Sequence, residues 1–352
     1  NAQLFVSTLF LFAPLVLFAA IFIWLRKITS HVWLAIFGSA LYAMSPVALA
    51  TINSGRLGTL IVMASLPLTL HLLGGTLEIE KLSIRKIFQL GIFLSVTIAF
   101  SLPYFLALGL FYTGLTAFDY LHSTREIWIK RVQNRVLLLA IPFFLNAPYT
   151  TEALVHPTRF LLEPGLALAG GGPNLALLSN PGGIGATPWW MVGPISALLL
   201  ISIFSRTNAR YFAFVGNGFL AISIALSGLS FPAHGTSIGY PLWVGTFLSI
   251  ATVAAITSGA IVLDQLRKHL EKAAVNYRHI MAALLLITSV VYTTGAAFWS
   301  VVTESPLHTI SSRVLPEFLG VTPGTKTVVL RKMDDGSLNY FIARGHDIYL
   351  GD

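Results

Sequence analysis

Arg56 is the first residue whose type and position suggest chemistry. It lies in a short polar connection, residues 53–58, between two stretches that contain no charged residue. An arginine next to apolar segments often marks a binding site or pairs with an anion, and a guanidinium group can hold a phosphate through two parallel hydrogen bonds. The sequence therefore favours a phosphate ligand at Arg56, with Asn53 beside it. An arginine that extends to lipid headgroups explains the same position equally well.

Glu152 is the candidate catalytic residue. It follows a short apolar run that ends at Tyr149, and a carboxylate in this position can accept a proton from a hydroxyl nucleophile. His156 and Arg159 lie nearby in the chain and, with Tyr149, are candidate substrate-binding residues. The alternative is a solvated carboxylate that pairs with Arg159.

Residues 150–188 form a long polar segment that contains Glu163 and two glycine-rich runs. Long segments without obvious structure are often functional or disordered. No Gly-Lys-Ser/Thr sequence follows, so this is not a phosphate-binding P-loop. Trp189 and Trp190 end the segment, and they are candidates for stacking on a sugar ring or an isoprenoid chain. Their alternative role is to anchor a helix at the membrane interface.

Composition argues against several other kinds of site. The chain has no cysteine, and the histidines at 71, 156 and 234 lack the spacing of metal ligands, so we expect no metal and no cofactor. The net charge of +8 could suggest a nucleic-acid partner. The basic residues instead form short clusters without interleaved aromatic residues, which indicates that nucleic acid is not a partner.

The elements that position these residues are expected to be membrane helices. Hydrophobic residues make up 55% of the chain and charged residues only 10%. A helix needs about 20 apolar residues to cross a bilayer. Seven stretches contain no Asp, Glu, Lys or Arg: residues 4–25, 32–53, 57–77, 87–118, 189–205, 211–263 and 280–303. The sequence therefore predicts an all-α polytopic membrane protein whose partner is the lipid bilayer.

Charge also predicts the topology. Most of the 22 Lys and Arg residues gather in short clusters between the uncharged stretches, and such clusters favour the cytoplasmic side. For the sides to alternate, residues 87–118 must turn near 101–103, and residues 211–263 near 231–235. The result is about ten transmembrane or re-entrant helices, with arms of only about 15 residues on either side of Pro103. We expect a multi-pass protein of the plasma membrane, with residues 150–188 outside. Because the uncharged stretches contain no carboxylate, an ion-coupled transporter is less favoured.

The last part of the chain has a different composition. Two β-prone runs, residues 327–331 and 338–342, flank the turn sequence Asp334-Asp335-Gly336. We therefore divide the chain into a transmembrane domain, residues 1–303, and a small extracytoplasmic β-containing segment, residues 304–352. The chain begins at Asn1 and ends soon after a β-prone run, so we expect it to be a piece of a longer protein.

Several short sequences together carry a family resemblance. They are Gly55-Arg56-Leu57-Gly58-Thr59, Leu162-Glu163-Pro164-Gly165, the run from Asn180 to Trp190, Ala225-Leu226-Ser227-Gly228, and the tail from Thr327 to Arg331 with Leu350-Gly351-Asp352. With them, nearly all of the chain resembles the C-terminal membrane portion of large actinobacterial cell-envelope proteins. In that family, a cytoplasmic family-two glycosyltransferase domain precedes the membrane region.

The resemblance implies a role in the synthesis of envelope polysaccharide. The membrane part looks like the GT-C class of glycosyltransferases, which use polyprenyl-phosphate-linked sugars. Such enzymes usually carry an acidic residue in their first outer loop, and none precedes Glu78 here. The resemblance therefore leaves two expectations open. The segment is a glycosyltransferase module acting at the outer face, or it translocates a product or anchors a fused upstream glycosyltransferase domain without catalysis.

Overall fold

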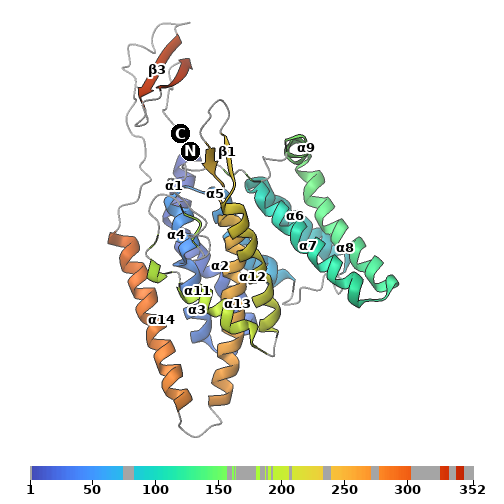
Figure 1. Cartoon of the computed structure of the whole chain (residues 1–352), viewed down its shortest axis with the longest axis vertical. Coiled ribbons are helices and arrows are strands. Elements are labelled where there is room, and N and C mark those ends of the chain that lie inside the picture. The colour runs from blue at the N-terminus through green and yellow to red at the C-terminus, as the bar shows by residue number, and fades with distance from the viewer. Residues whose placement is uncertain are drawn as a thin grey trace. The chain divides into compact units, whose positions relative to one another are not determined.

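The computed structural model describes residues 2–73, 83–156, 161, 163, 180–182, 187, 189–191, 193–205, 208–232, 239–270, 277–302, 326–332 and 338–344. The chain divides into two compact units, Asn1–Pro306 and Leu307–Asp352. The first unit is predominantly helical (Figure 1).

The helices of the first unit follow one another with short connections from Ala2 to Leu72 and from Ile84 to Val155. They are α1 (Ala2–Leu11), α2 (Ala13–Ile28), α3 (Val32–Ala43), α4 (Pro46–Asn53), α5 (Leu57–Leu72), α6 (Ile84–Phe100), α7 (Leu102–His122), α8 (Arg125–Leu145), α9 (Ala147–Val155), the 3₁₀ turn η3 (Trp189–Met191), α11 (Gly193–Ile203), α12 (Ala209–Ser227), α13 (Gly245–Leu270) and α14 (Tyr277–Val302).

Several of these helices are long and apolar enough to span a membrane. In the described part of the chain, three segments qualify by themselves: Val32–Asn53, Ala209–Ser227 and Gly245–Lys268. Two further candidates are bent pairs of helices, Leu4–Leu11 with Ala13–Ile28 at 60° and Arg125–Leu145 with Ala147–Val155 at 99°. This gives three to five candidate spans and supports a protein associated with the bilayer.

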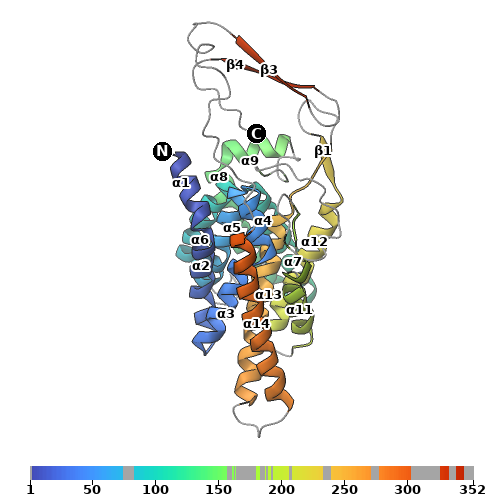
Figure 2. The same cartoon turned by 90° about the vertical axis from the view of Figure 1, so that its left-hand side faces the viewer.

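Helix α13 is the central element of the helical unit. It packs along α12 and α11 and also contacts α3 and α5 (Figures 1 and 2). A buried hydrogen bond of 3.0 Å from Trp24 Nε1 to Thr257 Oγ1 joins it to α2. Helices α6, α7 and α8 form a second group beside this bundle (Figure 1).

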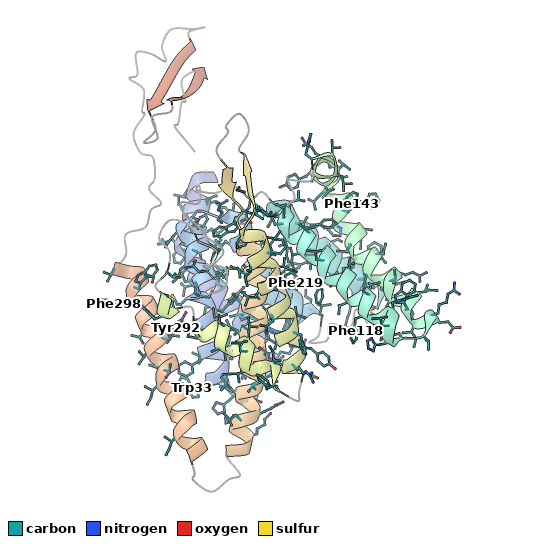
Figure 3. All side chains as sticks on the ribbon, in the orientation of Figure 1. Trp33, Phe118, Phe143, Phe219, Tyr292 and Phe298 are labelled. Carbon is teal, nitrogen blue, oxygen red and sulfur yellow. The ribbon has the colours of Figure 1, made fainter. Side chains whose placement is uncertain are left out.

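The outer surface of the helical unit is strongly apolar. Trp33, Phe118 and Phe298 are exposed by 61%, 58% and 70%, and Figure 3 shows Phe298 and Phe118 on opposite sides of the unit. Soluble proteins rarely expose apolar patches of this extent, whereas hydrocarbon chains cover such surfaces without penalty. The surface therefore agrees with helices that face lipid.

The helices extend further than the uncharged stretches predict. Helices α6 and α7 contain 17 and 21 residues, so the expected arms of about 15 residues were too short. Helix α8 begins at Arg125. The basic cluster that follows the uncharged stretch 87–118, predicted as a loop, therefore lies within a helix; its members are Arg125, Lys130, Arg131 and Arg135. The prediction was wrong because it ended helices at charged residues. Basic residues can lie within a helix near the membrane surface, because their long side chains let the charged groups reach a polar partner or water.

The same extension corrects the expectation that the helices lack carboxylates. Asp119 on α7 is buried, and its two oxygens pair with Arg131 and Arg135 of α8, each at 2.5 Å. Asp264 on α13 is also buried; it accepts hydrogen bonds from Ser30 and pairs with Lys268 at 2.7 Å. These carboxylates connect neighbouring elements and are neutralised by basic partners.

The break predicted near 101–103 coincides with a helix end, whereas the break predicted at 231–235 begins past the end of a helix, and its residues 233–235 lie outside the described residues. Ser101 separates α6 from α7, where Pro103 occupies the first turn of the new helix. Helix α12 ends at Ser227, and a short hairpin of β1 (Ser230–Pro232) and β2 (Gly239–Pro241) leads to α13.

The second unit contains a separate hairpin. Strands β3 (Lys326–Lys332) and β4 (Leu338–Arg344) pair antiparallel over seven residues, with Lys326 opposite Arg344 and Lys332 opposite Leu338. The residues predicted to form its turn, 334–336, lie outside the described residues.

Candidate functional site

A buried group of polar side chains lies where four segments of the helical unit meet. Arg56 precedes α5, Thr59 is in its first turn, and Ser101 joins α6 to α7. Trp243 and Thr246 lie at the start of α13, and Glu163 comes from the long segment 150–188. No member is exposed by more than 7%. We call these residues the polar cluster: Arg56, Thr59, Ser101, Glu163, Trp243 and Thr246.

The Glu163 carboxylate caps the N-terminus of α5. Oε1 accepts a hydrogen bond of 2.5 Å from the backbone N–H of Thr59, and Oε2 accepts one of 2.8 Å from the Thr59 hydroxyl. The Thr246 hydroxyl donates to Oε2 at 2.9 Å. Helix α5 has no cap from its own N-cap side chain, Arg56. An anion at a helix N-terminus satisfies free N–H groups and is stabilised by the helix dipole.

Arg56 is held from two directions. Its guanidinium group donates a hydrogen bond to the backbone carbonyl of Glu163 and lies 4.9 Å from the centre of the Trp243 ring, in cation–π geometry. The Trp243 indole donates to the Thr59 hydroxyl at 2.8 Å. The cluster is therefore one connected network, and each member helps to fix the orientation of the others.

Burial dominates the electrostatics of the two charged groups. It raises the pKa of the Glu163 carboxyl, against the opposing effects of the hydrogen bonds from Thr59 and Thr246 and of the Arg56 charge. Burial likewise lowers the pKa of Arg56, and Glu163 opposes that shift. A carboxyl with a raised pKa beside a guanidinium group can exchange a proton more readily than a solvated carboxylate, and such groups are enriched at functional sites.

Gly58 allows the segments to approach closely. A Cβ atom at this position would lie 2.4 Å from the Phe100 carbonyl oxygen and 3.0 Å from Glu163 Oε1. The end of α6 and the Glu163 side chain therefore occupy the space that any other residue would fill.

The structure brings Arg56 together with residue 163 of the long segment, not with residues 152–156. Glu152 and His156 are exposed on α9 and at its end, and Tyr149 on α9 is 41% exposed. Figure 1 shows α9 beyond the end of α8 and well to the side of α4 and α5. Asn53, the last residue of α4, is partly buried, and Arg159 lies outside the described residues.

The two tryptophans lie in η3. The Trp190 ring is 38% exposed and packs edge-to-face on Tyr292 of α14, with 6.1 Å between ring centres. The Tyr292 hydroxyl donates to the Met191 carbonyl at 2.8 Å. Trp190 thus attaches η3 to α14. The side chain of Trp189 is outside the described part of the structure.

Sequence reasoning found Arg56 but missed most of its partners. Thr59, Ser101 and Thr246 are single hydroxyl residues in apolar stretches, and each lies within the first turn of a helix or just before it. That shared position near a helix start is the signal that could have grouped them. Glu163 was recognised only as a carboxylate on the outer side.

Among the described residues, no group of three or more His, Cys, Asp or Glu could hold a metal ion. No protein-family model, curated protein or solved structure matches the chain.

Proposed function

We propose that this chain is the membrane module of a cell-envelope glycosyltransferase that acts on a polyprenyl-phosphate-linked sugar at the outer face. The observation that carries the proposal is the polar cluster, in which a buried guanidinium group and a buried carboxyl lie together at the ends of membrane helices. Buried charges beside apolar segments are costly, and they are most often retained for function.

The proposed topology follows from the helix ends. About ten helical passages would cross the bilayer: α1 with α2, α3 with α4, α5, α6, α7, α8 with α9, α11, α12, α13 and α14. The basic residues Arg26 and Lys27 end α2, and Arg125 begins α8. With these ends in the cytoplasm, the polar cluster and the segment 150–188 face outward. The tail would then lie outside the plasma membrane.

The proposed roles begin with the phosphate. Arg56 would bind it, and Asn53, Tyr149, His156, Arg159, Trp189 and Trp190 remain proposed contacts to the rest of the substrate. In the transfer step, the acceptor hydroxyl attacks the sugar, its proton passes to a carboxylate, and polyprenyl phosphate leaves. Glu163 is better placed than Glu152 to accept that proton, because Glu163 is buried beside Arg56 whereas Glu152 is exposed.

The test compares three variants of the full chain in membrane vesicles supplied with radiolabelled polyprenyl-phosphate sugars. Glu163→Gln should reduce sugar transfer by about a hundredfold to ten-thousandfold while retaining bound lipid phosphate. Arg56→Lys should weaken binding, because Lys cannot form the two parallel hydrogen bonds. Glu152→Gln is the matched control. Normal transfer by Glu163→Gln together with loss of transfer by Glu152→Gln would return the catalytic role to Glu152.

One observation favours a second candidate, a module that translocates lipid-linked product or anchors a fused glycosyltransferase domain. Glu163 is fully engaged as the cap of α5, and such a contact can hold the long segment in place without any chemistry. Binding of polyprenyl phosphate without transfer of any sugar offered, in wild-type protein, would favour this candidate.

A further inference from the structure

The polar cluster is closed in the structure. No member is exposed by more than 7%, so a ligand can reach Arg56 only if one of the surrounding segments moves. Arg56 is the N-cap residue of α5, and Thr59 lies in the first turn of that helix. The start of α5 therefore contributes two members of the cluster, and a bend within this helix would change the cluster directly.

Helix α5 has a weak point at Pro67, in its interior. In an α-helix each carbonyl accepts a hydrogen bond from the N–H four residues later, and Pro67 has no N–H to donate to the Met63 carbonyl. Met63 is fully buried, so water cannot replace the missing donor. Pro67 therefore divides α5 into a first part, residues 57–66, and a second part, residues 67–72.

Tyr42 of α3 supplies a donor to this carbonyl. The Tyr42 hydroxyl donates to the Met63 carbonyl at 2.7 Å, and the Tyr42 side chain is itself fully buried. Helix α3 packs against α2 and α13, so the donor belongs to the central bundle. Leaving a buried carbonyl without a donor is costly. One side-chain hydroxyl thus replaces the backbone hydrogen bond that Pro67 removes.

The two parts of α5 have different attachments. The second part is held at its end, where Lys27 of α2 donates to the His71 carbonyl at 3.0 Å. The first part belongs to the polar cluster through Thr59, whose hydroxyl accepts a hydrogen bond of 2.8 Å from the Trp243 indole. Interior prolines are a common cause of helix kinks. A bend at Pro67 would move the first part while the second part keeps its contact with α2.

We propose that Tyr42 is a positioning residue for the polar cluster. Its hydrogen bond to the Met63 carbonyl fixes the direction of α5 at Pro67 and so holds Arg56 and Thr59 in the closed arrangement. Without this bond, the first part of α5 bends more readily and Arg56 becomes accessible. The inference goes beyond the proposed function, because it concerns access to the cluster and holds for any ligand that binds there.

The experiment measures two properties of the full chain in nanodiscs. Hydrogen exchange reports the opening of α5, and phenylglyoxal, a reagent selective for arginine, reports access to Arg56. Tyr42→Phe should raise the exchange of residues 57–66 and the modification of Arg56 by about tenfold each, because a buried carbonyl loses its donor. Exchange of residues 68–72 should stay unchanged. Arg135 is the internal control, since it is as buried as Arg56, with both exposed by 6%.

Tyr292→Phe is the matched control variant. The Tyr292 hydroxyl also donates to the carbonyl of a fully buried methionine, Met191, at 2.8 Å, but it belongs to α14. The same atom is therefore removed from a similar hydrogen bond that does not involve α5. Exchange in α5 and modification of Arg56 should both remain as in the wild-type protein.

Pro67→Ala distinguishes positioning from a general loss of stability. Alanine restores an N–H that can donate to the Met63 carbonyl, so the Tyr42 hydroxyl is no longer needed there. In the Pro67→Ala background, Tyr42→Phe should therefore leave the modification of Arg56 within about twofold of the wild-type level, which is the non-additivity expected of two residues that act on one group.

Each outcome decides the inference. Unchanged modification of Arg56 in Tyr42→Phe would overturn it, as would an equal rise at Arg135 or in Tyr292→Phe. Failure of Pro67→Ala to restore the closed cluster would overturn it as well, because the effect of Tyr42 would then not pass through the Met63 carbonyl. If Tyr42→Phe alone does not fold, folding of the double variant supports the inference, and its failure to fold refutes it.

Discussion

At the scale of single residues, Glu163 connects protein stability to pH. Its carboxyl group is buried, and burial raises its pKa above the ordinary value of about 4.3. The folded chain therefore binds this proton more tightly than the unfolded chain does. Under that condition, the stability that the proton contributes is complete below the ordinary pKa and is lost as the pH rises through the raised value.

We predict that Glu163→Gln removes this part of the pH dependence. The melting temperature of the wild-type protein in detergent should fall as the pH rises above about 4.3, after the contribution of other groups is subtracted. The Gln variant cannot ionise, so its melting temperature should vary less over the same range. Glu152→Gln, at an exposed position, should behave as wild type. Identical pH profiles for wild type and Glu163→Gln would show that the pKa of Glu163 is the same in the folded and unfolded chain, which would contradict the raised value.

At the scale of elements, contacts between helix ends determine how the bundle is assembled. The start of α5 meets the end of α6 at Gly58, and α7 meets α8 through Asp119 and its two arginines. In each case one small or charged residue allows two helices to approach. These contacts can be tested separately, because they lie on different pairs of helices.

Gly58→Ala should destabilise the protein by about 1–3 kcal/mol, because the new Cβ would lie 2.4 Å from the Phe100 carbonyl oxygen. Gly109→Ala, inside α7, is the control: no atom lies within 4 Å of its Cβ position, and alanine favours the helix. Chemical denaturation in detergent measures both. If the two variants are equally stable, the close approach of α5 and α6 is not as described.

Asp119→Asn should destabilise the α7–α8 pair by about 3–5 kcal/mol, because it leaves Arg135 buried without its counter-ion. Glu126→Gln changes an exposed carboxylate on α8 in the same way and should have little effect. Hydrogen exchange of α7 and α8 is the measurement. Replacing both Asp119 and Arg135 by Leu should recover part of the loss, and failure to recover would indicate that Asp119 acts through other partners.

At the scale of the whole molecule, the number of membrane crossings is the property to test. Helix α8 and its bent continuation α9 are the most informative pair, because the 99° bend fits either a complete crossing or a re-entrant loop. The chain contains no cysteine, so single cysteines can be introduced without a background.

We predict that an impermeant thiol reagent labels Thr151→Cys and His156→Cys on intact cells. Glu126→Cys and Lys130→Cys should react only after permeabilisation, because α8 would carry the chain across the bilayer between the two pairs. All four positions are exposed in the protein. Labelling of both pairs from the same side would make α8 and α9 a re-entrant hairpin and would lower the proposed number of crossings.

The sequence by itself determined the class of structure and the positions of its main breaks. Long uncharged stretches can satisfy their backbone groups in a bilayer only as helices or closed barrels, and Pro103 suits the first turn of a new helix, where its missing N–H would have no intrahelical partner. The sequence also singled out Arg56, because a charge between apolar stretches is conspicuous. These features depend only on residues that are neighbours in the sequence, so the sequence of one chain is enough to identify them.

Only the tertiary structure decided which residues surround Arg56. Glu163 is 107 positions away from it and Thr246 a further 83, and no local pattern relates them. Their meeting depends on how α5, α6 and α13 pack, and on Gly58 leaving space for a distant carboxylate at the start of α5. The same packing places Glu152 away from Arg56, although a carboxylate base and a phosphate-binding arginine would suit the same reaction. Helix α7 also continues past the uncharged stretch that predicted it. Asp119 can be buried in that extension because it pairs with Arg131 and Arg135 of α8.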